Sequence, residues 1–303
     1  MTANACLGIL ILITLLVFGV FKHNVKAIKK PFEKIHFTCF CINLTSRSDR
    51  YARFMAQYNK SDLSHFPIQR LSAINGKKLY EYRGVEGLLT DQAIEELSDQ
   101  HVNGGRSGHH ELTPGAIGCY LSHVFSWEHI LQKDHEKEEE TDTHYLVFED
   151  DCNVPPTLNT QITECISGLN ELDSDWDILL LGAIVLKGRK TRNALLSKVS
   201  RFVLLHCYVI RPKAIYKIVE SNTLFPLGQQ IDFQLSDLAS TGAIRVYNGM
   251  GRKIRQGGFV TDIQTALINP SSLTRSGRDP PSFKDLDNDT RGVVVMPPVV
   301  TIT

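Results

Sequence analysis

The sequence predicts an α/β fold, and three stretches of the chain carry that prediction. Residues 37–44 form an apolar run that is followed by a polar turn and by apolar residues at helical spacing. Residues 146–148 form another apolar run, which is typical of a strand that is buried on both faces in a parallel α/β sheet. Between these two runs, Thr113 and Pro114 open a long amphipathic helix.

Composition places the chain among ordinary globular proteins. It has 303 residues, 42% of them hydrophobic, which is enough for one large or two small domains. Lys plus Arg and Asp plus Glu number 33 each, so no overall positive field attracts nucleic acid. Any binding of anions is therefore expected to be local.

The first 30 residues are predicted to be a membrane anchor and a basic linker. Residues 5–21 are apolar over 17 positions, close to the lower limit for a helix that spans a bilayer. The stretch has neither the basic start nor the small-residue cleavage site of a signal peptide. Four lysines follow it, which by the positive-inside rule places the globular part in the cytosol, although many anchored enzymes face the other way.

Residues 37–58 are predicted to begin a nucleotide-binding α/β unit. A strand at 37–44 leads through a polar turn to a helix that carries Tyr51 and Phe54. Arg47 and Arg50 flank the start of that helix, where the backbone N–H groups and the helix dipole favour anions. The alternative for each arginine is a solvated surface charge.

The remaining elements follow in order. Strands are predicted at 68–74, 177–181, 202–210 and 244–247, and helices at 91–97, 113–131, 157–169, 214–219 and near Asp232. The segment 187–192 is a basic cluster, either plain surface or an anion clamp. Residues 269–303 are rich in Ser, Pro, Arg and Asp and are predicted to be a flexible tail.

The strongest chemical signal is the run Glu149-Asp150-Asp151, which directly follows the strand at 146–148. Ligands of open α/β sheets bind beyond the carboxyl ends of the strands. Three neighbouring carboxylates repel one another unless a cation lies between them. The run therefore predicts a divalent metal, together with a metal-bound phosphate.

Histidine and cysteine give weaker signals. Ser122 and His123 are adjacent on the predicted helix, so they project about 100° apart and do not form a nucleophile and base pair. His123 is expected to orient the metal site or to contact a phosphate, with a plain core histidine as the alternative. The seven cysteines form no Cys-x-x-Cys pair, so zinc is not predicted, and they are expected to behave as small buried hydrophobic residues.

Five motifs resemble, in order and spacing, those of glycosyltransferase family 25. They are residues 41–50 (CINLTSRSDR), 70–76 (RLSAING), 112–127 (LTPGAIGCYLSHVFSW), 146–151 (LVFEDD) and 207–214 (CYVIRPKA). The resemblance covers roughly residues 36–268. The family includes bacterial lipooligosaccharide galactosyltransferases and collagen β-galactosyltransferases.

The resemblance implies an α/β fold of the GT-A type, with a Rossmann-like mixed sheet over residues 31–268. It also implies inverting transfer of a sugar, usually galactose, from a UDP-sugar to a hydroxyl of a glycan or of a hydroxylated protein, with the help of Mn²⁺ or Mg²⁺. Glu149 and Asp151 match the metal-binding positions of a DxD-like motif, with Asp150 beside them. The positions expected against the nucleotide are Asn43, Leu44, Arg47 and Arg50.

Catalytic roles are expected for Asp232 and His123, which match a family Asp near the acceptor and the family Ser-His. An inverting transfer needs a base that reaches the acceptor hydroxyl. Asp232 is the first candidate, while Glu149 and Asp150 are alternatives that a bound metal makes poor bases. A catalytically inactive relative, serving as a membrane-tethered adhesion or scaffold module, is the alternative from another functional class. A nucleotidyltransferase is disfavoured because residues 46–49 contain no glycine.

Overall fold

The computed structural model describes residues 35–81, 88–103, 111–136, 144–249, 254, 256 and 257, and the described helices and strands all lie in one compact unit that begins at His36. The predicted anchor at 1–30 and the predicted tail at 269–303 lie outside the described residues. Within the described part of the chain, no helix combines the length and the apolar character that crossing a bilayer requires.

The core of the unit is a mixed sheet of six strands in the order β2-β1-β3-β5-β4-β6. The strands are β1 (Phe37–Asn43), β2 (Ile68–Ser72), β3 (His144–Glu149), β4 (Ile178–Lys190), β5 (Leu196–Ile210) and β6 (Val246–Gly249). β1 is parallel to β2 and β3, whereas β5 is antiparallel to both β3 and β4. The predicted α/β class is confirmed. The mixed sheet expected from the family resemblance is also confirmed, because β3 is parallel to β1 and antiparallel to β5.

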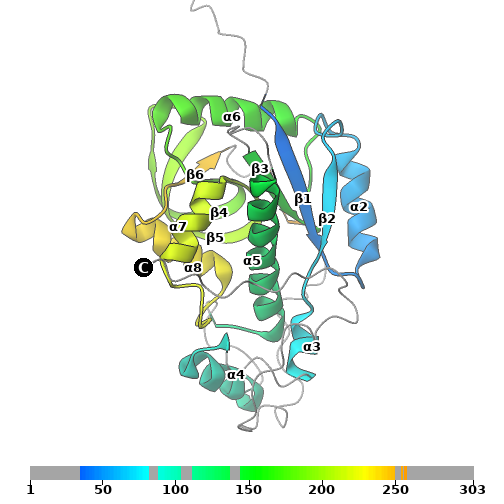
Figure 1. Cartoon of the computed structure of the whole chain (residues 1–303), viewed down its shortest axis with the longest axis vertical. Coiled ribbons are helices and arrows are strands. Elements are labelled where there is room, and N and C mark those ends of the chain that lie inside the picture. The colour runs from blue at the N-terminus through cyan, green and yellow to red at the C-terminus, as the bar shows by residue number, and fades with distance from the viewer. Residues whose placement is uncertain are drawn as a thin grey trace, which may run out of the picture. The chain divides into compact units, whose positions relative to one another are not determined.

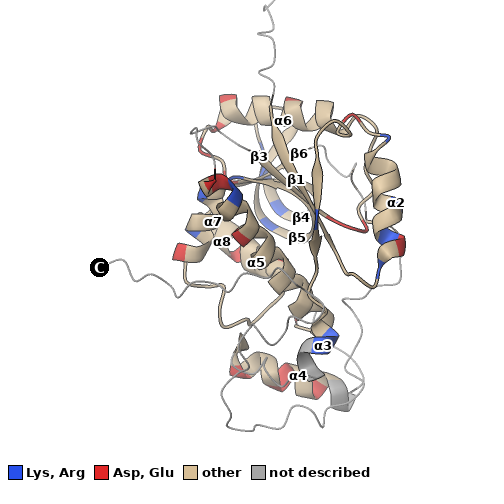
Figure 2. Ribbon diagram, turned by 45° about the vertical axis from the view of Figure 1, so that its right-hand side comes forward, with Lys and Arg blue, Asp and Glu red and all other residues tan. Residues whose placement is uncertain are grey.

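Helices cover both faces of this sheet. They are α2 (Ser48–Tyr58), α3 (Gly76–Glu81), α4 (Asp91–Asn103), α5 (Pro114–His135), α6 (Leu158–Leu172), α7 (Pro212–Glu220) and α8 (Ile231–Thr241). α5 crosses in front of the sheet with α7 and α8 beside it (Figure 1). After a 45° turn, the sheet is seen between this group and α2 (Figure 2).

The alternation of side chains along β3 decides which helices its residues meet. Tyr145 and Val147 belong to the core cluster that includes the apolar face of α5. Phe148 points to the other face, where its ring lies 5.3 Å from that of Phe54 on α2. Because successive residues of a strand alternate between faces, Glu149 is directed to the α5 side, and Asp150 follows on the α2 side.

The N-terminus of α5 is fixed by local chemistry and by close packing. The hydroxyl of Thr113 accepts a hydrogen bond from the Ala116 N–H at 3.0 Å, and Pro114 occupies the first turn, as predicted. A Cβ atom on Gly76 would lie 1.6 Å from the Pro114 carbonyl oxygen, and one on Gly118 would lie 2.4 Å from that of Ile74. Only glycine at both positions lets the loop after β2 pack directly on α5.

Two predicted elements differ from the structure. β4 and β5 form a hairpin that extends well beyond the predicted 177–181 and 202–210, and its outer part includes the basic residues from Lys187 to Lys190. β6 pairs with β4 and also with the outer part of β5. These long-range pairings stabilise the outer hairpin, whose β4 residues are mostly exposed.

Candidate active site

A cavity of about 400 Å³ lies at the carboxyl ends of β1, β2 and β3, between the sheet and the N-terminal half of α5. Its walls also include part of β5, the start of α8 and the segment at 256–257. The lining residues with ionisable or amide side chains are Arg50, Asn75, Lys77, Cys119, His123, Glu149, Asp150, Asp151, His206, Gln230, Asp232 and Gln256. The cavity thus brings together residues more than 200 positions apart in the sequence.

Strand register explains why these side chains converge. Ile42 of β1 pairs with Glu149 on one side of β3, and Cys207 of β5 pairs with Phe148 on the other. Since β5 runs antiparallel to β3, His206 comes next to Glu149 across the strands. Both side chains are on the face covered by α5, where they line the same cavity.

A chain of hydrogen bonds leads from the core to Glu149. The indole N–H of Trp127 donates to the Tyr208 hydroxyl at 2.9 Å, and that hydroxyl lies 3.0 Å from His123 Nδ1. His123 Nε2 lies 3.2 Å from Glu149 Oε1. If Tyr208 donates its hydrogen to Nδ1, the neutral imidazole carries its own on Nε2 and donates it to Glu149.

The environment of Glu149 keeps it ionised. Burial by itself raises the pKa of the Glu149 carboxyl, but the hydrogen bond with His123 and the electrostatic influence of His123, His206 and Arg50 act against burial, and the net direction is down. His123 therefore both orients this carboxylate and favours its charged form. The role of His123 in orienting a metal site stays a prediction.

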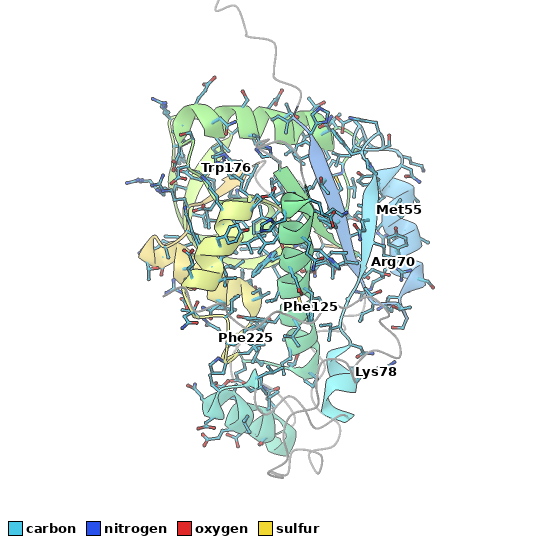
Figure 3. The ribbon with its side chains drawn as sticks, in the orientation of Figure 1. Met55, Arg70, Lys78, Phe125, Trp176 and Phe225 are labelled. Atoms are coloured by element: carbon cyan, nitrogen blue, oxygen red, sulfur yellow. The ribbon has the colours of Figure 1, made fainter. Side chains whose placement is uncertain are left out.

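Asp150 is held on the other side of the strand end. Its carboxylate accepts hydrogen bonds from the Asn43 amide and, at 3.4 Å, from Arg50 of α2. Arg70 of β2 donates to Asn43 Oδ1 and lies over the Tyr51 ring, between β2 and α2 (Figure 3). Burial raises the Asp150 pKa, and these donors oppose the rise without cancelling it.

Asp151 is the least compensated carboxylate of the three. Its Oδ2 accepts from the Gln256 amide at 2.8 Å, while the buried Oδ1 has no hydrogen-bond partner among the described residues. Burial, followed by the charge of Glu149, raises the pKa of Asp151 to about 7. An oxygen that is buried without a donor is the kind of atom that a cation would satisfy.

Asp232 is buried at the start of α8. Its carboxylate accepts from the backbone N–H groups of Leu204 at 2.8 Å and Phe233 at 2.9 Å. Leu204 has a φ of 70°, which is strained for a residue other than glycine. Leu204 is one of the β5 residues that line the cavity. Burial raises the Asp232 pKa more strongly than the two backbone donors lower it.

The other predicted nucleotide contacts are divided between the cavity and its surroundings. Leu44 and Arg50 line the cavity. Asn43 is buried behind Asp150 and donates to it as well as to the Arg47 carbonyl oxygen. Arg47 is not a lining residue, and its guanidinium forms an ion pair with Asp49 at 3.1 Å.

Some lining residues were not predicted, and two of them, His206 and Cys119, have side chains of types that can bind a metal. Burial lowers the pKa of His206, while the charge of Glu149 and a backbone hydrogen bond with Ile254 oppose this shift. The Cys119 sulfur, His123 and Glu149 offer ligand atoms that all lie within 4.8 Å of one another. Burial, and then the nearby carboxylates, raise the Cys119 pKa well above its usual range. The spacing of Cys119 and His123, one helical turn apart, was visible in the sequence.

Comparison with protein-family models gives one match over most of this unit. The model described as "Glycosyltransferase family 25 (LPS biosynthesis protein)" matches residues 36–233. That range includes every cavity residue named above except Gln256.

Individual relatives are about a quarter identical to this chain, over about half of its length. "Procollagen galactosyltransferase 2" of Homo sapiens is 24% identical over 156 residues, which is 51% of this chain and 21% of the relative. "Inactive glycosyltransferase 25 family member 3" of Homo sapiens is 26% identical over 163 residues, 53% of this chain and 24% of the relative. The chain thus spans about a quarter or less of the length of these relatives. A structure of UDP-glucose pyrophosphorylase with UDP-glucose matches 71% of this chain and 90% of its own, with a TM-score of 0.32 at 10% identity.

Proposed function

The chain belongs to glycosyltransferase family 25, and we propose that it transfers a sugar, with galactose expected, from a UDP-sugar to a hydroxyl of a glycan or of a hydroxylated protein. The family predicted from the five motifs is confirmed. One observation carries the proposal: a single cavity gathers the acidic run after β3, the turn after β1 and a buried carboxylate at Asp232. The mixed sheet supports a fold of the GT-A type as part of the same proposal.

Glu149 and Asp151 fit a divalent cation such as Mn²⁺ or Mg²⁺. Carboxylate oxygens are the ligands that these hard cations prefer, and Asp151 Oδ1, which has no hydrogen-bond partner within the described part of the chain, is a ready ligand atom. When bound, such a cation offsets the negative charge that develops on the leaving UDP. His123 holds Glu149 in the ionised form, and Asn43 and Arg50 fix Asp150 next to it.

Asp232 is the proposed base on the acceptor side. An inverting transfer requires a group that takes the proton from the attacking hydroxyl. The raised pKa of Asp232 makes its carboxylate a better proton acceptor than an exposed aspartate. The two backbone donors hold this carboxylate in place, and one of them comes from the strained Leu204.

The test of this function is release of UDP from a panel of UDP-sugars, with and without Mn²⁺, alongside calorimetric titration of UDP. Mn²⁺-dependent turnover with one sugar supports the proposal. Absence of both turnover and Mn²⁺-dependent UDP binding would overturn it. Tight Mn²⁺-dependent binding without turnover on any acceptor would favour the inactive adhesion or scaffold alternative, a possibility underlined by a relative that is named as inactive.

The base assignment has its own test. Asp232→Asn should keep Mn²⁺-dependent UDP binding and lose transfer by about 100- to 10,000-fold. Asp237→Asn is the matched control, because Asp237 lies on the same helix but forms an exposed ion pair with Arg201. Full activity in Asp232→Asn would show that another group is the base.

We also propose that residues 1–30 tether the domain to a membrane, and this part of the proposal rests on the sequence alone. The positive-inside rule places the globular part on the cytosolic side of that membrane. Protease digestion of sealed vesicles that carry the full chain, followed by immunodetection of the domain, would test this placement. Protection in intact vesicles and cleavage after detergent would place the domain in the lumen.

A further inference from the structure

Cys119, His123 and Glu149 form a cluster of three different metal-ligand types in the wall of the cavity. Cys119 and His123 are four residues apart on α5, so they project from the same face of the helix. Glu149 reaches them from the end of β3. The sulfur, the imidazole nitrogen and the carboxylate oxygen all lie within 4.8 Å of one another.

The spacing of these atoms suits a small tetrahedral cation. With bonds of about 2.0–2.3 Å to nitrogen, oxygen and sulfur, neighbouring ligand atoms around zinc lie roughly 3.3–3.7 Å apart. His123 Nε2 and Glu149 Oε1 are already 3.2 Å apart. The Cys119 sulfur lies within 4.8 Å of both atoms, so a small movement of its side chain brings it to ligand distance.

The outer contacts of His123 are those of a metal ligand. Histidine ligands are generally fixed by a hydrogen bond at the ring nitrogen that does not bind the metal. His123 Nδ1 lies 3.0 Å from the Tyr208 hydroxyl, which is itself held by Trp127. The Tyr208 oxygen has two lone pairs, so it can accept from Trp127 and from Nδ1–H together, which leaves Nε2 for a cation.

Charge in the cavity also favours a cation at this position. The Cys119 sulfur experiences the negative fields of Glu149, Asp232 and Asp151. Cys119 and Glu149 are both partly exposed, so an ion can enter from the cavity. With three protein ligands, the fourth position of a tetrahedral centre faces that space, as in metal sites that keep one position for water or substrate.

We propose that Cys119, His123 and Glu149 bind a thiophilic divalent cation such as Zn²⁺. Sulfur and imidazole ligands select this class of metal, whereas the oxygen pair of Glu149 and Asp151 suits Mn²⁺ or Mg²⁺. Glu149 belongs to both sets, so the two kinds of cation compete for it. The thiophilic site shares Glu149 with the proposed sugar-transfer site, but binding of Zn²⁺ to Cys119, His123 and Glu149 can be measured without a sugar donor.

Cobalt spectroscopy of the full chain tests the proposal without any sugar donor. Titration with Co²⁺ should give a saturable sulfur-to-cobalt charge-transfer band in the near ultraviolet and intense visible bands of tetrahedral cobalt. Added Zn²⁺ should remove both. Absence of the charge-transfer band in the wild-type protein would overturn the proposal.

Variants identify the ligands. Cys119→Ser should abolish the charge-transfer band, while Cys152→Ser should retain it, since Cys152 is also a buried cysteine near Glu149 and Asp151 but is not part of the cluster. Tyr208→Phe should keep the band and weaken Zn²⁺ binding by about 10- to 100-fold. Circular dichroism confirms that each variant is folded. A band that persists in Cys119→Ser, or that is lost equally in Cys152→Ser, would show that the sulfur of Cys119 is not the ligand.

Discussion

Three carboxylates gather near each end of the sheet, and the two groups differ in how many cationic side chains face them in the described part of the chain. The cavity carboxylates are Glu149, which is the last residue of β3, and Asp150 and Asp151, which follow it. The β4 carboxylates are Asp173, Asp175 and Asp177, just before β4. Since β3 and β4 both run antiparallel to β5, they run in the same direction, and the end of β3 and the start of β4 lie at opposite ends of the sheet. Figure 3 shows Trp176, which lies between Asp175 and Asp177 in the sequence, far from Lys78, whose neighbour Lys77 lines the cavity.

The β4 carboxylates are matched by cations. Lys217 binds Asp177 at 2.8 Å, Arg245 binds Asp173 at 2.9 Å, and Lys213 binds Asp175. The hydrogen bond from Lys213 lowers the Asp175 pKa. In Asp173, burial alone would raise the pKa, but hydrogen bonds from Tyr247 and Arg245 bring it down.

The cavity carboxylates have fewer such partners. Arg50 reaches Asp150 at 3.4 Å, and the pKa values of Asp150 and Asp151 are raised, chiefly by burial. In sequence, both groups are short acidic segments next to an apolar strand. The number of acidic residues is therefore the same in both groups. What differs is how many Lys and Arg side chains pair with them, and the group with fewer such pairs is the one suited to bind a cation.

The largest expected effect concerns binding. Asp151→Asn should weaken Mn²⁺-dependent UDP binding by at least about 100-fold, because it removes a charged first ligand of the proposed cation. Calorimetry with UDP and Mn²⁺ measures this. Asp175→Asn, from the other group, is the control and should bind as the wild type does. Unchanged binding by Asp151→Asn would show that Asp151 is not a ligand of a cation that binds UDP.

The next effect concerns stability. Asp177→Asn should lower the free energy of unfolding by about 3 kcal/mol, because Asp177 is fully buried and its loss leaves Lys217 without its nearest partner. The backbone N–H of Arg245 also donates to Asp177 at 2.7 Å, and Asn can still accept this bond. Urea unfolding at pH 7 measures the difference. A decrease in the free energy of unfolding of less than about 1 kcal/mol would show that the pair of Asp177 with Lys217 contributes no more than an exposed surface pair.

A smaller effect, of opposite sign, depends on pH. The pKa of Asp151 is about 7 in the folded protein against an ordinary 3.8, so between these values the folded state holds a proton that the unfolded state releases. Stability from this group is therefore present at low pH and is lost as pH rises towards 7. Asp151→Asn, which cannot ionise, should stabilise the metal-free protein at pH 8 by on the order of 2 kcal/mol and hardly at pH 4.

Urea unfolding of the wild type and of Asp151→Asn at pH 4, 6 and 8, with a chelator present, measures this dependence. Excess Mn²⁺ should restore the wild type and leave the variant unchanged, since the cation favours the charged carboxylate. A difference in stability that is the same at all three pH values would show that ionisation of Asp151 does not destabilise the fold.

The smallest effect sharpens the comparison at the β4 carboxylates. Lys213→Gln should change the free energy of unfolding by less than about 1 kcal/mol, because its pair with Asp175 is partly exposed. Arg245 also lies 3.2 Å from Asp175, so the carboxylate keeps a cation. A larger loss on urea unfolding would indicate that these pairs act as one cooperative network.

The elements that form the core were predictable from the sequence. β1 and β3 are buried on both faces, so their residues are nearly all apolar, and the Thr-Pro start of α5 carries its own capping chemistry. The outer half of the β4–β5 hairpin was not predictable. Residues such as Leu186 are exposed there, and pairing with distant segments holds the strands.

The candidate site was predictable only in part. Glu149 and Asp151 stand out because they follow a strand without interruption, and this local signal needs no knowledge of the fold. His206 follows apolar residues of β5, and its nearness to Glu149 depends on the register that pairs Phe148 with Cys207. Such a register between segments far apart in the chain is not written in either segment.

The hydrogen bonds that orient His123 also give the cavity a natural fluorescent reporter. Trp127 and Trp176 are the 2 tryptophans of the chain. The Trp127 indole donates to Tyr208 and so begins the series of hydrogen bonds that reaches Glu149. The Trp176 indole donates to Asn170, at the opposite end of the sheet. A cation that rearranges the hydrogens around His123 thus changes the surroundings of one emitter and leaves the other as an internal reference. The occupancy of this cavity can therefore be followed in the unlabelled protein by its intrinsic emission.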